Sequence, residues 1–424
     1  MATSQDVDVV SVANNEAPSA PRAKMIAVLG ALIALGPLTL DLYLPALPKI
    51  TADLSVSSSV TQLTLTGTLA GLALGQLIVG PLSDSLGRRK PLIVGIVLHM
   101  VASVVCVFAP NIEILGAGRV LQGIGASAAM VVSFAVVGDL FDDSAAATVF
   151  SRLMLVLGAG PVIAPSLGAA VLLRASWHWT FAVLVVLAGA LLVVAVFALP
   201  ETLPPANRRP LRLRGVLSTY ASLLRDVRFV TLVAVASLSI SGLFAYISGA
   251  SFVLQGHYGL TQQVFAIVFG AGAIWFIAAT QVNVVLLKRF SPQTIVVSAL
   301  SGAVVVGAVF VGLSMAHLGG LPAFLVPVWL VLAAMGLVIP NAPALALSRH
   351  HEAAGTAAAL LGAGQFGVGA LIAPLVGVLG NDEVALALVL AIGVTVALVA
   401  LLLVIRLGDD EPLAHGPADE PHSE

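Results

Sequence analysis

Two opposite charges, Asp41 and Arg119, stand inside long apolar stretches of the sequence. Asp41 occurs in "GPLTLDLYLPALPKI" (36–50) and Arg119 in "GRVLQGIGASAA" (118–129). An ionised side chain at the centre of a membrane costs at least ~3 kcal/mol, so such residues usually face the interior of a helix bundle and act there. A carboxylate near a permanent cation that favours its ionised form can take up and release a proton. Asp41 is therefore the candidate proton carrier and Arg119 its partner.

Composition indicates a membrane protein. Of 424 residues, 59% are hydrophobic and 9% are charged, and the mean hydropathy is +1.07. Soluble domains carry about 25% charged residues. The single cysteine, Cys106, excludes an intrachain disulfide. No P-loop is found in the sequence, which argues against direct drive by ATP.

Apolar runs of the length that a helix needs to cross the hydrocarbon predict twelve spans in an all-α membrane fold. The expected spans are 25–47, 60–82, 90–109, 112–138, 147–172, 178–199, 229–254, 262–287, 293–316, 322–347, 354–380 and 383–406. A Pro- and Arg-rich segment, 200–228, divides them into two six-helix halves, 25–199 and 229–406. The polar tails, 1–24 and 407–424, are expected to be disordered.

The distribution of Lys and Arg predicts the orientation. With the N-terminus inside, sixteen of these residues fall in inner segments and two, Lys49 and Arg174, in outer loops. The positive-inside rule then makes both termini cytoplasmic. We expect a multi-pass protein of the cytoplasmic membrane.

The expected helix ends place Asp41 and Arg119 at one depth. If the first span ends near Leu47, Asp41 lies six residues, roughly 9 Å, below its outer end. Arg119 lies seven residues, roughly 10 Å, below the start of its own span. The two groups could pair directly, through water, or during part of a cycle. A fixed ion pair that only orders the helices is the alternative.

The two halves share a short repeat. "IAPSLG" (163–168) and "IAPLVG" (372–377) occupy the fifth span of each half. A duplicated six-helix unit predicts such a match, and two repeats around a site at the midplane suggest alternating access. The same residues could also serve helix packing alone.

The loop between the second and third spans resembles a known family. "GPLSDSLGRRKPL" (80–92) matches the major facilitator signature at Gly80, Leu82, Asp84, Gly87, Arg88 and Arg89. Further stretches resemble the Bcr/CflA group of drug:proton antiporters: "DLYLPALPKI", "GRVLQGIGASAA", "LPETLPP" (199–205), "GLFAYISGASFVLQGHYGLTQQVFAIVFG" (242–270) and "IPNAPALAL" (339–347). The resemblance implies two pseudo-symmetric six-helix halves and export of drug-like compounds in exchange for protons.

The loop motif can act as a cytoplasmic gate. Gly87 permits a tight turn, Arg88 and Arg89 lie at the anionic leaflet, and Asp84 can accept a charge-assisted hydrogen bond. Asp139, with Asp142 and Asp143, is the expected partner of the arginines. The arginines could instead only fix the topology.

The antiporter motif of the fifth span departs from its general form. Val156 stands where the family has a glycine before Gly160-Pro161, and Ala164 and Pro165 stand at the later glycine positions. The Bcr/CflA group resembles this variant, so antiport remains the expectation. The residues assigned to the motif and its helix packing are Gly158, Gly160, Pro161, Pro165 and Gly168.

Polar residues in the spans are candidate substrate contacts. They are Gln122, Tyr246, Asn341 and Gln365. We expect a monomer that binds drug-like small molecules, protons and membrane lipid, uses the proton gradient as its energy source, and needs no cofactor, metal or nucleic acid. The alternative is a facilitator or importer of a small metabolite with the same fold. A non-transporting membrane receptor or an enzyme is not expected, because the sequence has no sizeable soluble domain and no catalytic constellation.

Overall fold

The structure is a computed structural model in which residues 20–407 are described, except 142, 209, 211 and 348–353. In this part of the chain twelve helical segments are long and apolar enough to cross a membrane. The N-terminal half contains α1 (Ala20–Ile33), α2 (Leu35–Asp41), η1 (Leu44–Ala46), α3 (Leu47–Asp53), α4 (Ser58–Leu86), α5 (Arg89–Val107), α6 (Ile112–Leu140), α7 (Asp143–Leu172) and α8 (His178–Ala198). The linker contains η2 (Pro205–Asn207) and α9 (Leu213–Arg225). The C-terminal half contains α10 (Val227–Ser251), η3 (Phe252–His257), α11 (Gln262–Leu286), α12 (Pro292–Met315), α13 (Gly320–Leu347), α14 (Ala354–Ile372), α15 (Leu375–Val378) and α16 (Glu383–Leu407).

Eleven of the predicted spans agree with the structure to within four residues at each end. The first is wrong at its C-terminal end, because the span continues to Asp53 as α1, α2, η1 and α3. The predicted span ends at Leu47, because Pro48 and Lys49 end the apolar run. Pro48 falls in the first turn of α3, a position where its missing N–H costs nothing. Asp41 therefore lies twelve residues, not six, before the end of the span.

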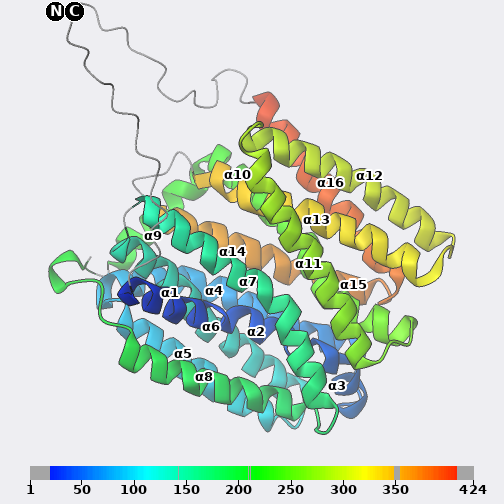
Figure 1. Ribbon diagram of the computed structural model, residues 1–424, viewed down its shortest axis with the longest axis horizontal. Coiled ribbons are helices and arrows are strands. Elements are labelled where there is room, and N and C mark those ends of the chain that lie inside the picture. The colour runs from blue at the N-terminus through cyan, green and yellow to red at the C-terminus, as the bar shows by residue number, and fades with distance from the viewer. Residues whose placement is uncertain (1–19, 142, 209, 211, 348–353, 408–424) are drawn as a thin grey trace, which may run out of the picture.

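The two halves repeat one packing pattern (Figure 1). In the first half α6 packs against α4 and α5, and α5 packs against α8. In the second half α13 packs against α11 and α12, and α12 packs against α16. The halves meet where α4 packs against α14 and α7 against α11. Since α4 corresponds to α11 and α7 to α14, this junction has the same two-fold relation as the halves themselves.

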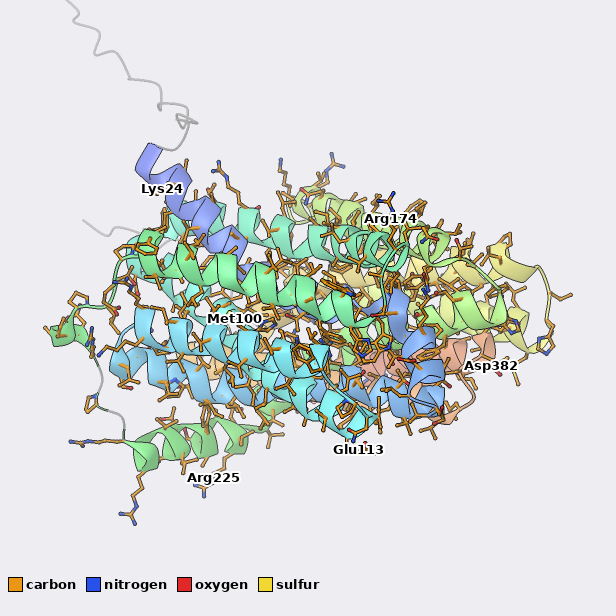
Figure 2. All side chains as sticks on the ribbon, turned by 90° about the horizontal axis from the view of Figure 1, so that it is seen from below. Lys24, Met100, Glu113, Arg174, Arg225 and Asp382 are labelled. Atoms are coloured by element: carbon orange, nitrogen blue, oxygen red, sulfur yellow. The ribbon has the colours of Figure 1, made fainter. Side chains whose placement is uncertain are left out.

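The charged residues mark the two ends of the bundle. Figure 2 shows Lys24 and Arg225 toward one end, Glu113 and Asp382 toward the other, and Met100 between them. The end that carries the linker and Lys24 is called the linker side below, and the other end the opposite side. The predicted tails fall mostly outside the described residues.

Close helix contacts explain three of the motif glycines in α7. A Cβ added at Gly160 would lie 2.2 Å from Cβ of Pro37, and one added at Gly168 would lie 1.8 Å from the carbonyl oxygen of Leu42. A Cβ added at Gly158 would meet Ile277 of the other half at 3.1 Å. Gly160 and Gly168 thus let α7 pack on the first span, whereas Gly158 faces α11. Pro161 and Pro165 lie inside α7, which continues through both.

Gly168→Ala should destabilise the protein, since the new methyl group would meet backbone, which cannot move like a flexible side chain. We expect a loss of about 1–3 kcal/mol, measured as a lower midpoint of thermal unfolding in detergent. Gly302→Ala is the matched control: it lies within α12 and its added Cβ has no heavy atom within 4 Å. An unchanged midpoint for Gly168→Ala would contradict the close contact with Leu42.

Candidate functional site

Asp41 is the last residue of α2 and is almost fully buried, with 2% of its surface exposed. Its Oδ1 atom has no hydrogen-bond partner. Among the described residues no ion pair within 4.0 Å joins it to Arg119, so the direct pairing considered from the sequence does not occur in this conformation. A buried carboxylate with one unpartnered oxygen is therefore the central chemical feature of the first half.

The carbonyl group of Thr39 and the amide of Gln122 bind Arg119 instead. Arg119 Nη2 donates to Thr39 O at 2.9 Å, and Nη1 donates to Gln122 Oε1 at 2.8 Å. Its guanidinium lies over the ring of Tyr43, 4.0 Å from the centroid, and 5.7 Å from that of Phe181. Arg119 is fully buried, so these contacts replace the hydration of its charge by carbonyl dipoles and aromatic faces.

Hydrogen bonds continue from Arg119 to His99 on α5. Gln122 Nε2 donates to Ser103 Oγ at 2.7 Å, and Ser103 Oγ donates to His99 O at 2.7 Å. Thr39 Oγ1 donates its one proton to Leu35 O at 2.6 Å and therefore accepts from His99 Nε2 at 2.8 Å. His99 thus carries its proton on Nε2, and it joins the first span to the network. The arginine network below means Thr39, His99, Ser103, Arg119 and Gln122.

The break in the first span supplies the carbonyl groups at this site. The last four carbonyls of a helix have no partner within it, and Pro45 has no N–H with which to continue the ladder. Thr39 O, near the end of α2, accepts from Arg119. Beyond the break, Leu44 O accepts from Ser251 Oγ of the second half at 2.6 Å. Asp41 therefore lies between a carbonyl that binds the arginine and one that binds the other half.

Among the described residues, no hydrogen bond or ring contact joins any two of the four predicted substrate contacts. Gln122 belongs to the arginine network. Tyr246 on α10 stacks on Phe269, with ring centroids 5.0 Å apart, and its buried hydroxyl has no partner. Asn341 Nδ2 on α13 donates to Asn283 Oδ1 of α11 at 2.7 Å. Gln365 on α14 is half-buried. Only Tyr246 thus presents a buried polar atom that is still free to bind.

Arg88 is the centre of the motif on the linker side. Its Nε and Nη2 donate to the two carboxylate oxygens of Asp139 at 2.9 and 3.2 Å, and Nη1 donates to Asp84 Oδ1 at 2.6 Å. Burial alone would lower the pKa of Arg88, but its bonds to Asp139 and Asp84 outweigh this and raise it. The predicted pairing of Arg88 with Asp84 and Asp139 is present, and it joins α4, α5 and α6 within one half. Asp142 and the side chain of Asp143 lie outside what the structure describes.

Glu201, just after α8, completes this cluster and was not predicted from the sequence. Its carboxylate accepts the backbone N–H groups of Arg88 at 2.8 Å and Arg89 at 3.3 Å, at the positive end of α5. Gly87 has a φ of +89°, and a Cβ there would lie 2.5 Å from Glu201 Oε2. The backbone conformation therefore favours glycine at 87, and a larger residue would also displace the Glu201 carboxylate, whereas a Cβ at Gly80 would have no heavy atom within 4 Å. Arg89 donates to the carbonyl of Val196 on α8.

Several side-chain hydrogen bonds between the halves lie on the opposite side of the bundle. Gln62 Nε2 on α4 donates to Ser248 O at 3.2 Å and to Asn381 Oδ1 at 2.5 Å. Asn381 Nδ2 donates to Ser58 Oγ at 2.7 Å, and Ser59 Oγ donates to Gly377 O at 2.8 Å. These residues form the opposite-side junction, which holds the halves together at the end far from the Arg88 cluster.

Comparison with known proteins decides the family. The family model described as Major Facilitator Superfamily matches residues 27–374, from the first span into the eleventh. The chain belongs to the major facilitator superfamily. The "Uncharacterized MFS-type transporter YdgK" of Bacillus subtilis is 38% identical over 84% of this chain and 89% of that protein. The "Bicyclomycin resistance protein homolog" of Haemophilus influenzae is 31% identical over 85% of this chain and 90% of that protein.

A more distant relative and a solved structure agree with this membership. "Multidrug resistance protein MdtL" of Citrobacter koseri is 28% identical over 91% of this chain and 95% of that protein. The xylose transporter XylE from E. coli, in a conformation described as partially occluded and inward open, superposes with a TM-score of 0.70. It covers 92% of this chain and 98% of XylE at 14% identity, so the likeness concerns the fold. As a major facilitator, the chain is a transporter of small molecules.

Asp139→Asn should destabilise the protein more than Asp84→Asn. Asp139 makes two bonds to Arg88 and accepts from Thr202 at 2.7 Å, and its side chain is 16% exposed against 45% for Asp84. We expect a loss of about 1.5–3 kcal/mol for Asp139→Asn and below about 1 kcal/mol for Asp84→Asn, read from thermal unfolding. The opposite ranking would mean that Asp84, not Asp139, is the main anchor of Arg88.

Proposed function

We propose that this transporter exports drug-like small molecules across the cytoplasmic membrane in exchange for protons, by alternating access, with the linker side in the cytoplasm. The observation that carries the proposal is Asp41, a carboxylate that is buried in the first span and has an oxygen without a partner. The relatives named for bicyclomycin and multidrug resistance support the substrate class. The excess of Lys and Arg in the linker-side segments supports the orientation.

The environment of Asp41 suits a group that changes its charge. An ionised carboxylate that is buried without a partner is expensive, so the neutral acid is the cheaper form in this conformation. A conformation that admits water or a cationic substrate to the same carboxylate would favour proton release. The transporter would then carry one proton inward on Asp41 and release it before, or together with, the binding of substrate.

The arginine network keeps a fixed positive charge near this carboxylate. Arg119 cannot lose its proton in a protein, and its bonds to Thr39 and Gln122 hold it in place without neutralising it. The positive charge favours the ionised form of Asp41 whenever water or substrate compensates the rest of its desolvation. Arg119 thus limits how tightly Asp41 holds its proton, so that the proton can leave on the cytoplasmic side.

Asp41→Asn tests the carrier role, because it keeps the shape of the side chain and removes its titration. In inverted vesicles energised with a proton gradient, we expect the variant to bring the accumulation ratio of a transported compound to about one, since without proton coupling no gradient can be built. Substrate binding and downhill exchange should survive. Substrates can be chosen from a panel of amphipathic cations, with lumenal pH followed in the same vesicles.

Asp53→Asn is the matched control, since it makes the same substitution at the end of the same span. Asp53 is exposed and accepts a hydrogen bond from Trp177 Nε1 at 2.8 Å, which an asparagine oxygen can also accept. This variant should accumulate substrate like the parent. Full uphill accumulation by a well-expressed Asp41→Asn protein would end the carrier proposal. Transport by the parent protein from the outer face to the cytoplasmic face of the membrane would instead favour an importer.

The opposite-side junction would be the closed outer gate of this conformation. Gln62 contributes two hydrogen bonds from the first half to the second, to Ser248 and Asn381. Alternating access requires these bonds to break each time the outer side opens. Their strength therefore sets part of the balance between the two conformations.

Gln62→Ala should shift this balance toward the outward-open form. Losing two hydrogen bonds of about 1 kcal/mol each should raise the outward-open population about thirtyfold. The measurement is the rate at which a membrane-impermeant maleimide labels Ser248→Cys from outside, in a Cys106→Ala background.

Thr68→Ala is the control for the gate, since Thr68 lies on the same helix and its hydroxyl donates to Thr64 O of that helix at 3.1 Å. It should leave the labelling rate unchanged. Equal rates for Gln62→Ala and the parent would show that the junction does not limit opening.

A further inference from the structure

The linker helix α9 carries arginines and apolar residues in a pattern that neither the transport site nor the gate uses. Residues 205–225 contain five arginines and no acidic residue. Within α9, Val216, Tyr220 and Leu223 recur at positions i, i+4 and i+7, so they share one face of the helix. These three are partly or fully buried, and they mark the face turned to the protein.

The protein-facing side fixes α9 to both halves of the transporter. The Tyr220 hydroxyl donates to the carbonyl oxygen of Leu77 on α4 at 3.0 Å. Burial, with a smaller contribution from the Asp84 carboxylate, raises the pKa of Tyr220, so the phenol keeps the proton that it donates. Leu223 packs with Phe229 of α10 and Ala357 of α14. The helix is thus held in a defined place rather than free in solution.

The neighbouring side of α9 is apolar and has no protein against it. Leu217 and Leu224 are 64% and 57% exposed, and Ala221 between them is exposed as well. These residues, spaced by four and three, form one continuous strip along the helix. An exposed apolar strip of this kind on a surface helix normally faces another apolar phase.

Arginines line the edge of this strip. Arg214 and Arg225 are eleven residues, about three turns, apart and therefore lie on one line of the helix, next to Leu217, Ala221 and Leu224. Both are exposed, and no ion pair to either is found among the described residues. Figure 2 shows Arg225 on the side of α9 that points away from the bundle. Around the helix, the side that contacts the protein is thus followed by the apolar strip, then by the two arginines, and then by small polar residues.

The depth of α9 agrees with the surface of a bilayer. Leu77, whose carbonyl binds Tyr220, lies nine residues before the end of α4 at Leu86, about 13 Å along the helix. The long side chain of Tyr220 reaches inward to this carbonyl, so the backbone of α9 lies closer to the end of α4 than Leu77 does. The helix therefore lies near the boundary between the hydrocarbon and the polar headgroups on the linker side. An amphipathic helix with basic residues beside its apolar face is stable in that layer.

We propose that α9 is a binding surface for anionic phospholipid, with Leu217, Ala221 and Leu224 against the acyl chains and Arg214 and Arg225 on the headgroup phosphates. Arginine binds phosphate through parallel hydrogen bonds, and each arginine near an anionic leaflet favours it on the order of fivefold. Because α9 contacts α4 of one half and α10 and α14 of the other, lipid bound to α9 would lie beside a helix that connects the two halves.

Fluorescence quenching by brominated lipid in bilayers tests the proposal on the full-length protein. A fluorophore on Ala221→Cys, in a Cys106→Ala background, reports the lipid beside the strip. We expect brominated phosphatidylglycerol to quench it several-fold more effectively than brominated phosphatidylcholine at the same mole fraction. Raising the salt from about 50 mM to about 0.5 M should reduce this difference in the parent protein, because exposed charges are screened.

Charge variants identify the residues responsible. Arg214→Gln with Arg225→Gln should remove the preference for phosphatidylglycerol, whereas Arg214→Lys with Arg225→Lys should keep most of it. Lys288→Gln with Arg289→Gln, which removes two exposed charges from the loop between α11 and α12, is the matched control and should leave it unchanged. Equal quenching by the two lipids in the parent, quenching by neither, or a preference that does not respond to salt would each overturn the proposal. Each of these results is independent of whether the protein exports drugs.

Discussion

The burial of Arg119 without an ion pair is the constraint on which the first half depends. A permanent cation at this depth must be compensated, and the compensation comes from Thr39 O, Gln122 and the face of Tyr43. These partners lie on the first span and on the arginine's own helix, and the Gln122 amide extends the bonding to Ser103 of α5. Helices of one half are therefore held in a fixed arrangement by a charge that no carboxylate neutralises, which leaves Asp41 free to change its state.

The second half is built differently. Its spans contain no Lys, Arg, Asp or Glu away from their ends, and the contact of Asn341 with Asn283 inside them joins neutral groups. Its buried acid, Glu383, lies at the start of α16, where it contacts His317 and accepts from Tyr258. The Arg88 cluster likewise connects α4, α5 and α6 of the first half. Charge chemistry is thus concentrated in one half, while the other meets it through the opposite-side junction. This division suits a rocking motion in which one half carries the proton and the other follows.

Much of this fold could be predicted from the sequence because lipid imposes a simple rule on helix length. Eleven spans and the Asp84, Arg88 and Asp139 cluster follow from apolar runs and from one local motif. The end of the first span could not be predicted, since Pro48 begins a new helix as readily as it ends an old one. The partners of Arg119 were equally hidden: a backbone carbonyl such as Thr39 O has no signal in the sequence, and neither has the contact of Glu201 with the start of α5. Both depend on tertiary packing.

The break in the first span connects the proposed proton site to the proposed gate. In a continuous helix Thr39 O would accept from the N–H of Tyr43, whereas here it accepts from Arg119. Leu44 O would face Pro48, which has no N–H, and it accepts from Leu47 N–H and from Ser251 Oγ. Pro45 has no N–H for the carbonyl of Asp41, and Gly168 lets α7 approach the buried carbonyl of Leu42. Protonation of Asp41 changes the charge at the end of α2, where the free carbonyls already carry negative partial charge. The same few residues thus bear on the arginine network and on a bond between the halves, so a change of charge at Asp41 can alter the stability of the junction without any longer path through the protein.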